Sequence, residues 1–350
     1  MSTETAAARQ PARTAKQEPE PEDVYGRKAR VPSQIPLIGW IQIAHRVWHE
    51  SGRDNLSVVS AGCAFYALFA IFPALSGLIS LYGLMASPAT VEQHFSILDA
   101  LLPEQAYQMV EQQIHRLAAT SSQSLGYSLA LSLGLALWST SLAAQAMFAA
   151  LNIAYEEEER RSLLGYYFGA SIFAVIGILG GLLMLLAIIY VPTWIDVLGF
   201  SEPFEQIVRI ARWPFLAVIT LLALALLYRY GPCRRPANWH WVSVGSAFAT
   251  AFWLLASGGF SLYVANFAHY DRIYGSLGAV IILLFWLYLS FYIVLLGAEI
   301  NAELELQTAE DTTIGRSRPM GQRGAFVADH VAGGPSGAKR PYNPHAGQMR

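Results

Sequence analysis

Charged residues are scarce in this sequence and unevenly distributed. Asp, Glu, Lys and Arg make up 14% of the 350 residues and hydrophobic residues make up 54%, whereas an average soluble domain is about 25% charged. Most of the charges lie near the two ends of the chain and in short loops. The apolar runs between them match the ~20 residues that cross a bilayer as a helix. The composition therefore excludes a soluble globular protein.

Cysteine is also scarce, and a signal sequence is missing. Cys63 lies within an apolar run and Cys233 in a short basic loop, so we predict no disulfide framework. Residues 1–30 are polar and contain no apolar core of the kind that a secretory signal needs. We therefore expect no cleavable signal peptide, and the first membrane span acts as the insertion signal.

Motifs that bind nucleotides or supply a catalytic nucleophile are absent. The sequence has no Walker A loop, no dinucleotide-binding glycine fingerprint and no nucleophile elbow. His45 and His49 are four residues apart and Glu50 follows, which is a spacing that can hold a metal. No further ligand lies near them in sequence, so we interpret them as a solvated polar face. We predict no enzymatic activity, no cofactor and no metal site.

Hydrophobic runs predict an all-α, polytopic membrane protein with six transmembrane helices. The spans cover about residues 57–86, 126–153, 163–191, 213–229, 240–266 and 275–300. The fourth is the shortest, and Arg212 and Arg229 at its ends can extend toward the headgroups. We predict a membrane domain over residues 35–306, between disordered tails at residues 1–34 and 307–350.

Two segments outside the spans have the apolar periodicity of helices. In residues 35–50, Trp40, Ile41 and Trp48 share one face, opposite His45 and Arg46. This pattern suits a helix that lies in the membrane interface before the first span. The loop after the first span carries apolar stripes at residues 91–102 and 106–117, which predict two short amphipathic helices over the outer mouth of the bundle.

The basic residues orient the chain in the membrane. The N-terminal tail, the loops after the second and fourth spans, and the C-terminal tail together carry most of the Lys and Arg. Segments rich in these residues stay in the cytoplasm. We therefore predict a protein of the bacterial inner membrane with both termini in the cytoplasm.

Small residues at four-residue spacing predict where the spans touch one another. The pairs are Ser60 and Ala64, Ser139 and Ala143, Gly165 and Gly169, and Gly177 and Gly181. Within the first span, Pro73 removes one backbone hydrogen bond and should kink the helix. The kink serves either packing alone or a gating hinge.

Polar residues from three spans and one loop reach the cytoplasmic end of the predicted bundle. Polar groups in a membrane are costly and mark candidate functional positions. The candidate substrate-binding residues are Asp54, Asn152, Tyr155, Arg229, Arg235, Glu299 and Asn301. They form either a ring of helix ends solvated by water and headgroups, or a vestibule in which arginines bind an anionic headgroup. We interpret residues 156–161, four Glu and two Arg, as a solvated loop.

Four stretches of this sequence resemble the YihY/virulence factor BrkB family of bacterial inner-membrane proteins. They are SAGCAFYALFAIFPALSGLISLYGL at 60–84, LWSTS with ALNIAY within 137–155, LYRYGP with NWHWVSVGSAFA within 227–249, and YGSLGAVIILLFWLYLSFYIVLLGAEINAELE at 274–305. The resemblance implies a six-span helical fold. Members of this family once carried a ribonuclease label, and others have been linked to envelope lipid export.

Two functions fit these observations. The first is a transporter or flippase-like protein for an envelope lipid or another amphipathic anion, and the second is a non-transporting scaffold that supports envelope integrity. The scarcity of ionisable groups near the bilayer centre favours the scaffold, because coupled pumps need such groups. A ribonuclease is not expected, because the sequence clusters no metal-binding carboxylates. The expected partners are membrane lipids and envelope proteins rather than nucleic acid, and the sequence leaves the oligomeric state open.

Overall fold

The computed structural model describes residues 23–85, 122–198, 202–267 and 277–333 of the chain, and these residues are mainly helical. Their elements are η1 (Pro32–Gln34), α1 (Leu37–Arg53), α2 (Leu56–Met85), α5 (Ser122–Ala154), α6 (Leu163–Leu198), α7 (Glu202–Tyr230), α8 (Trp239–Phe267), α10 (Leu277–Gln307) and α11 (Phe326–Asp329). The extended pairing found within these ranges is a single antiparallel bridge between Ala237 and Thr313. The all-α prediction is therefore confirmed for this part of the chain.

Five of the described helices are long and apolar enough to cross a membrane. Their candidate spans are Leu56–Ala74, Leu133–Ala154, Leu163–Gly180, Trp239–Val264 and Val280–Gln307, and a shorter apolar stretch in α7 covers Pro214–Tyr230. This shorter stretch is the predicted fourth span. The amphipathic helices predicted for the first loop lie outside the described residues. Pro73 lies inside α2, which continues past it to Met85, and its role as a hinge stays a prediction.

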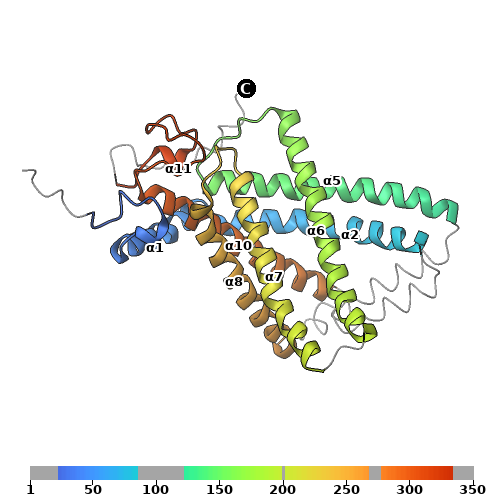
Figure 1. Ribbon diagram of the computed structural model, residues 1–350. Coiled ribbons are helices and arrows are strands. Elements are labelled where there is room, and N and C mark those ends of the chain that lie inside the picture. Colours follow the sequence, from blue (N-terminus) through green and yellow to red (C-terminus); the bar gives the residue numbers. More distant parts are fainter. Residues whose placement is uncertain (1–22, 86–121, 199–201, 268–276, 334–350) are drawn as a thin grey trace, which may run out of the picture.

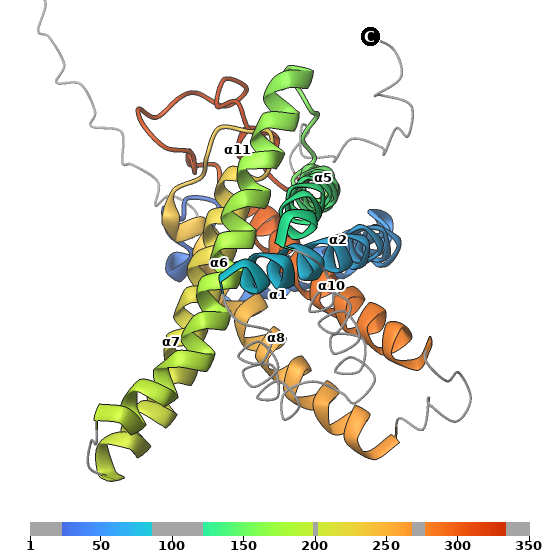
Figure 2. The same ribbon diagram turned by 90° about the vertical axis from the view of Figure 1, so that its right-hand side faces the viewer.

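The helices pack as a series of neighbours. α6 contacts α5, α5 runs along α2, α2 contacts α10, α10 packs on α8, and α8 packs on α7. In Figures 1 and 2 the helices converge at one end, where α1 and α11 also lie, and diverge toward the other. We call the converging end, formed by residues 23–56, 152–163, 228–241 and 299–333, the polar end.

Glycine allows the closest approach between α8 and α10. A Cβ built on Gly245 would overlap the carbonyl oxygen of Gly297, and a Cβ on Gly297 would lie 2.8 Å from the Gly245 carbonyl oxygen. The side-chain oxygen of Asn301 accepts a hydrogen bond from the Gly245 N–H at 2.7 Å. Farther along, the indole N–H of Trp253 donates to Ser290 Oγ at 3.0 Å. Close backbone contact and hydrogen bonds, rather than apolar attraction, hold helices together in lipid.

The predicted small-residue contacts are partly confirmed. Ser60, Ala64 and Ser139 are buried in the contacts of α2 and α5. The prediction is wrong for α6, because a Cβ on Gly169 or Gly177 would meet no other atom within 4 Å. α6 instead turns Ala170 and Ala174 toward α5, where the aromatic rings of Phe148, Tyr166 and Phe173 fill the contact.

The two tails are ordered where they meet the polar end, and the prediction of disorder is wrong there. Residues 23–34 form turns, with Asp23 accepting hydrogen bonds from the N–H groups of Arg27 and Lys28. Residues 308–333, which we call the C-terminal strap, fold back over the helix ends. Arg323 holds the strap by donating to the carbonyl oxygens of Ala309, Glu310, Arg318 and Ala328. Composition misses such a segment because backbone carbonyls fix it together with only a few apolar side chains, such as Phe326 and Val327.

Helix α1 packs both apolar and polar side chains against the bundle and leaves its other large apolar side chains exposed. Ile43 and Val47 are buried, and Arg46 and Gln42 bond to α10, whereas Leu37, Ile41 and Trp48 are 75%, 61% and 82% exposed. An exposed face of large apolar residues is what a helix resting on lipid presents. The location of α1 in the membrane interface stays a prediction.

Candidate functional site

The last turns of α10 carry three fully buried carboxylates. Glu299, Glu303 and Glu305 each have 0% of their surface exposed, as does Asn301 between them. The helical repeat of 3.6 residues places Glu299 and Glu303 on one side and Asn301 and Glu305 on another. The end of α10 therefore presents charge to neighbours on two sides, and burial of charge is costly unless it is paired.

On one side, Arg46 of α1 pairs with Glu303. Its guanidinium Nε makes a very short contact with the Glu303 carboxylate, and Nη2 donates to the Glu303 carbonyl oxygen at 3.1 Å and to Gln307 Oε1 at 2.8 Å. The side-chain amide of Gln307 donates to the Tyr25 carbonyl oxygen at 2.7 Å. This network joins the N-terminal residues and α1 to α10.

On the other side, Arg234 of the α7–α8 loop pairs with Glu305. Arg234 Nη2 lies 2.6 Å from Glu305 Oε2, and the two side chains are 2% and 0% exposed. Thr312 of the C-terminal strap donates its hydroxyl to the same carboxylate oxygen. Burial acts to lower the pKa of Arg234, but the charge and hydrogen bond of Glu305 outweigh it and raise that pKa above its ordinary value. The pair is therefore buried and shared by three segments.

Tyr155 lies against this ion pair. Its side chain is fully buried, and the Arg234 guanidinium carbon lies 5.0 Å from the ring centre. Burial and the charge of Glu305 raise the pKa of the Tyr155 hydroxyl above its ordinary value of 10.0. Tyr155 thus stays protonated at neutral pH and serves as a cation–π partner for Arg234.

Asn152 and Asn301 are bound to backbone groups. Asn152 Oδ1 accepts from the Cys233 N–H at 2.7 Å, and its amide donates to Glu159 at 3.0 Å. Asn301 bridges to α8 through the Gly245 N–H and the Val242 carbonyl oxygen. The structure therefore gives both predicted site residues a part in joining α5 and α10 to their neighbours.

The two predicted arginines, Arg229 and Arg235, have surroundings that differ from those of Arg234. Arg235 donates to the Arg316 carbonyl oxygen at 3.4 Å, and its N–H bonds to the Gly324 carbonyl oxygen at 2.9 Å, so it is part of the contact with the strap. Arg229 stacks on Trp239, with its guanidinium carbon 4.2 Å from the ring centre. The structure therefore does not bring the three arginines of this region to one point.

Residues 156–161 are only in part the solvated loop that the sequence indicates, because Glu158, Glu159 and Arg160 are exposed but the other three are half-buried. Glu157 accepts from the Phe326 N–H at 2.6 Å, and burial raises the pKa of its carboxyl group. Arg161 pairs with Glu159 at 2.8 Å and lies 5.0 Å from the Phe148 ring centre. Between this loop and the strap is a cavity of about 340 Å³, lined by Glu156, Glu157, Glu158, Arg160, Gly321, Gln322, Gly324, Ala325, Phe326, Asp329 and His330.

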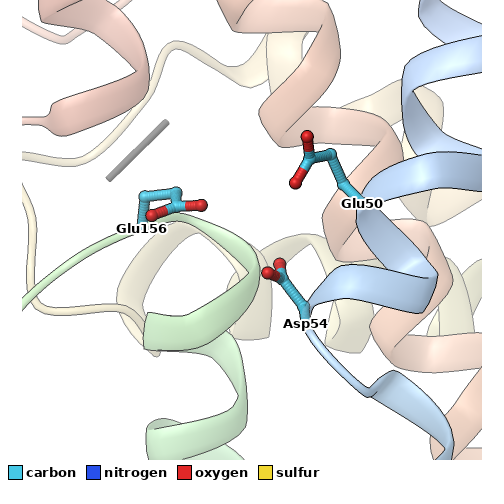
Figure 3. A group of neighbouring side chains, drawn as sticks. All are labelled: Glu50, Asp54 and Glu156. Atoms are coloured by element: carbon cyan, nitrogen blue, oxygen red, sulfur yellow. The ribbon is translucent and has the colours of Figure 1, made fainter. Parts of the chain in front are cut away.

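Three further carboxylates, which we call the acidic triad, meet where α1 and α5 end. One carboxylate oxygen each from Glu50, Asp54 and Glu156 lies within 4.8 Å of the others, and Figure 3 shows the three side chains turned toward one another. Asp54, another predicted site residue, is 8% exposed. Carboxylate oxygens at such separations are the ligand type that Ca²⁺ and Mg²⁺ use. Sequence spacing could not connect Glu156 with Glu50, and His45 and His49 are not members of this group.

Sequence reasoning missed the residues that do most of the pairing at the polar end. Arg46, Glu303, Glu305, Gln307 and Arg323 were not among the candidates. One signal was present: the last span continues without a break into the alternating residues 302–307, AELELQ. A helix that keeps apolar residues on several sides after leaving the membrane needs protein around it.

Apolar helices long enough to span a bilayer, with paired charges gathered at one end, define a multi-pass membrane protein. The family model described as virulence factor BrkB matches residues 47–320. The chain belongs to this family, which confirms the resemblance seen in the sequence. The match includes the α10 carboxylates and the first part of the C-terminal strap.

Relatives of the chain are named as membrane proteins or as ribonuclease-like. A putative ribonuclease-like protein YfkH of Bacillus subtilis is 32% identical over 250 residues, covering 70% of this chain and 88% of the relative. UPF0761 membrane proteins of Cronobacter sakazakii and Rhodospirillum centenum are 26% and 27% identical, over 77% and 87% of this chain and 89% and 65% of the relatives. No solved structure matches the chain.

Proposed function

We propose that this protein spans the inner membrane six times, with both termini in the cytoplasm, and moves an anionic amphipathic molecule such as an envelope lipid. The short apolar stretch of α7 supplies the sixth span, flanked by Arg212 and Arg229. The excess of Lys and Arg in the tails and in the loops at the polar end orients this end to the cytoplasm. Helix α1 then rests on the inner leaflet with Leu37, Ile41 and Trp48 in the headgroup region.

The buried Arg234–Glu305 pair is the observation that carries the proposal. Apolar residues of similar volume often stabilise a core as well as a buried ion pair does, or better. A charged contact between the α7–α8 loop, α10 and the strap therefore adds little net stability for its cost. It suits a contact that opens and re-forms, which is what a cytoplasmic gate requires. We expect this pair to be the lock of a closed cytoplasmic end.

A scaffold without transport is the second candidate, and the bonding of Asn152 and Asn301 favours it. Both amides, predicted to face a substrate, bind backbone groups of neighbouring segments instead. A polar end whose groups satisfy one another has no need of a substrate. In that case the strap and the exposed face of α1 would serve partner proteins or the membrane surface.

Neither candidate is an enzyme, although one relative carries a ribonuclease-like name. The acidic triad is the carboxylate group within the described residues that most resembles a metal-dependent hydrolytic centre. Glu156 is followed directly by Glu157 and Glu158. Their charge repels a nucleic-acid backbone, whose binding depends on Lys and Arg.

Leaflet exchange in proteoliposomes distinguishes transporter from scaffold. The full chain is reconstituted with a fluorescent phosphatidylglycerol, and the fraction of label that a membrane-impermeant quencher reaches is followed over time. Wild type should accelerate exchange over protein-free liposomes, and Glu305→Gln, which weakens the lock, should change the rate at least threefold. Glu310→Gln is the matched control, because Glu310 sits on the strap in an exposed pair with Arg30 at 4.0 Å. Absence of exchange by folded wild type would reject the transporter and leave the scaffold.

A further inference from the structure

Arg229 differs from Arg46 and Arg234 in its hydrogen bonding within the described residues. It lies in the last turn of α7 with 8% of its surface exposed, and its Nε and Nη1 atoms are buried without a hydrogen bond. By contrast, Arg46 and Arg234 pair with carboxylates of α10. A buried cation without an acceptor is unfavourable, and the described residues supply no hydrogen-bond acceptor to these two nitrogens.

The local structure fixes Arg229 in this position. The neighbouring Tyr228 is 1% exposed and donates its hydroxyl to the Val294 carbonyl oxygen at 2.7 Å, which anchors the end of α7 on α10. Arg229 is thereby directed to α8, where its guanidinium carbon lies 4.2 Å from the Trp239 ring centre and 5.5 Å from that of Tyr230. These two residues are 47% and 54% exposed, so the guanidinium lies directly beneath the surface.

Trp239 is also the first residue of α8, so Arg229 lies beside the start of a long helix. The first N–H groups of a helix have no partner within it, and the helix dipole favours an anion there. Asn238 precedes the helix, but its side-chain amide donates to the Thr313 carbonyl oxygen at 3.0 Å. The guanidinium of Arg229 thus lies against the side chain of the first residue of α8.

We propose that Arg229 and the N-terminus of α8 bind the phosphate of an anionic phospholipid, with Trp239 and Tyr230 flanking the headgroup. Guanidinium and helix N-termini are both established phosphate partners. Exposed Trp and Tyr mark the headgroup level of a bilayer, which makes a lipid, rather than a free metabolite, the source of the phosphate. The inner leaflet follows from the proposed orientation, whereas the site itself does not depend on transport.

Lipid binding by the purified full chain tests this site. Native mass spectrometry in detergent compares phosphatidylglycerol with phosphatidylcholine, for wild type, Arg229→Gln, Arg229→Lys and the control Arg316→Gln, whose arginine is exposed on the strap. Arg229→Gln should weaken phosphatidylglycerol binding about 10-fold, the size of a lost charge-assisted contact. Arg229→Lys should retain part of the affinity, and the control should match wild type. Equal binding by wild type and Arg229→Gln would overturn the proposal.

Two further measurements distinguish a lipid site from a structural arginine and from a plain anion site. If phosphatidylglycerol raises the melting temperature of wild type but not of Arg229→Gln, the residue acts through the lipid. A lower melting temperature of the variant with unchanged lipid binding would show a purely structural role and reject the site. Competition by inorganic phosphate at millimolar concentration without any effect of lipid would show an anion site that is not a lipid site, and would also overturn the proposal. Leaflet exchange is scored separately, so unchanged lipid binding by Arg229→Gln together with intact exchange rejects this site and leaves the transporter proposal standing.

Discussion

Replacing Arg234 with Gln removes the positive charge from beside a carboxylate that is fully buried. Loss of one partner of a buried ion pair costs ~3–5 kcal/mol, because the other charge stays desolvated. The Thr312 hydroxyl still donates to Glu305 and offsets about 1 kcal/mol of this loss. We therefore expect Arg234→Gln to lower the free energy of unfolding by about 3 kcal/mol, and Glu305→Gln to have an effect of similar size.

The double variant separates the interaction from the cost of burial. With both charges removed, the double variant Arg234→Gln/Glu305→Gln should lose at least ~2 kcal/mol less free energy of unfolding than the two single variants lose together. The assay is reversible unfolding in mixed micelles titrated with sodium dodecyl sulfate, followed by tryptophan fluorescence. Glu310→Gln, in the exposed pair with Arg30, should change stability by less than ~1 kcal/mol. The ion pair as described would be refuted if Arg234→Gln left the free energy of unfolding unchanged, or if the coupling energy from the double-mutant cycle were below about 0.5 kcal/mol.

Three other predictions concern separate parts of the molecule. Gly245→Ala places a methyl group against the Gly297 carbonyl oxygen and should lower the free energy of unfolding by ~3 kcal/mol or more in the same assay. Gly169→Ala, the control, should change it little. Equal effects of the two variants would contradict the close contact between α8 and α10. Asp311 accepts from two N–H groups and the Thr313 hydroxyl, and although burial acts to raise the pKa of its carboxyl, these hydrogen bonds hold it below 3.8. The ionised Asp311 carboxylate therefore stabilises the strap above pH ~4, and this stabilisation is lost as the pH falls through the lowered pKa. We expect Asp311→Asn at pH 7, like wild type in acid, to make the strap accessible to limited proteolysis. A variant as resistant to the protease as wild type would contradict this. Asp54→Asn should raise the melting temperature by relieving repulsion within the acidic triad, worth about 1 kcal/mol; a lower melting temperature would show that a proton or cation already neutralises the triad.

Hydropathy predicted the helices well, because the bilayer imposes a length on each apolar run. The described α2, α5, α6, α8 and α10 each contain a candidate span where the sequence placed one. α7 carries the shorter apolar stretch Pro214–Tyr230 where the sequence predicts the fourth span, and its crossing of the membrane stays a prediction. The fold class thus follows from one physical constraint that acts on each helix separately.

The face that a helix presents was harder to predict than the helix itself. Gly165 and Gly169 have the spacing of a packing motif, yet Ala170 and Ala174 make the contact with α5. Both sets have four-residue spacing, and the aromatic rings around Phe148 decide between them. That choice depends on the neighbouring helix, which sequence periodicity does not include.

The candidate residues lie together at one end of the bundle, and their part in binding a substrate stays a prediction. Asn152 and Asn301 do gather there, as their positions near span ends require. Their partners, Cys233 and Gly245, are backbone groups, and a backbone partner leaves no mark in residue composition. The sequence does not single out Glu303 and Glu305 as candidate site residues, because a charged stretch after a span resembles a solvated helix end until its arginine partners are known.

The strap explains why so much charge can be buried at the end of a membrane domain. Glu305 accepts a hydrogen bond from the Thr312 hydroxyl, and Glu157 accepts one from the Phe326 N–H. The strap thus supplies donors that the helices lack. Arg323 in turn satisfies the carbonyl oxygens that hold the strap in its fold. The polar end is thus closed by hydrogen bonds together with apolar packing of Phe326 and Val327 on the core. Arg229 is not part of this network, so it is available to bind a lipid. Arg234, which follows it in the α7–α8 connection, is instead paired with Glu305.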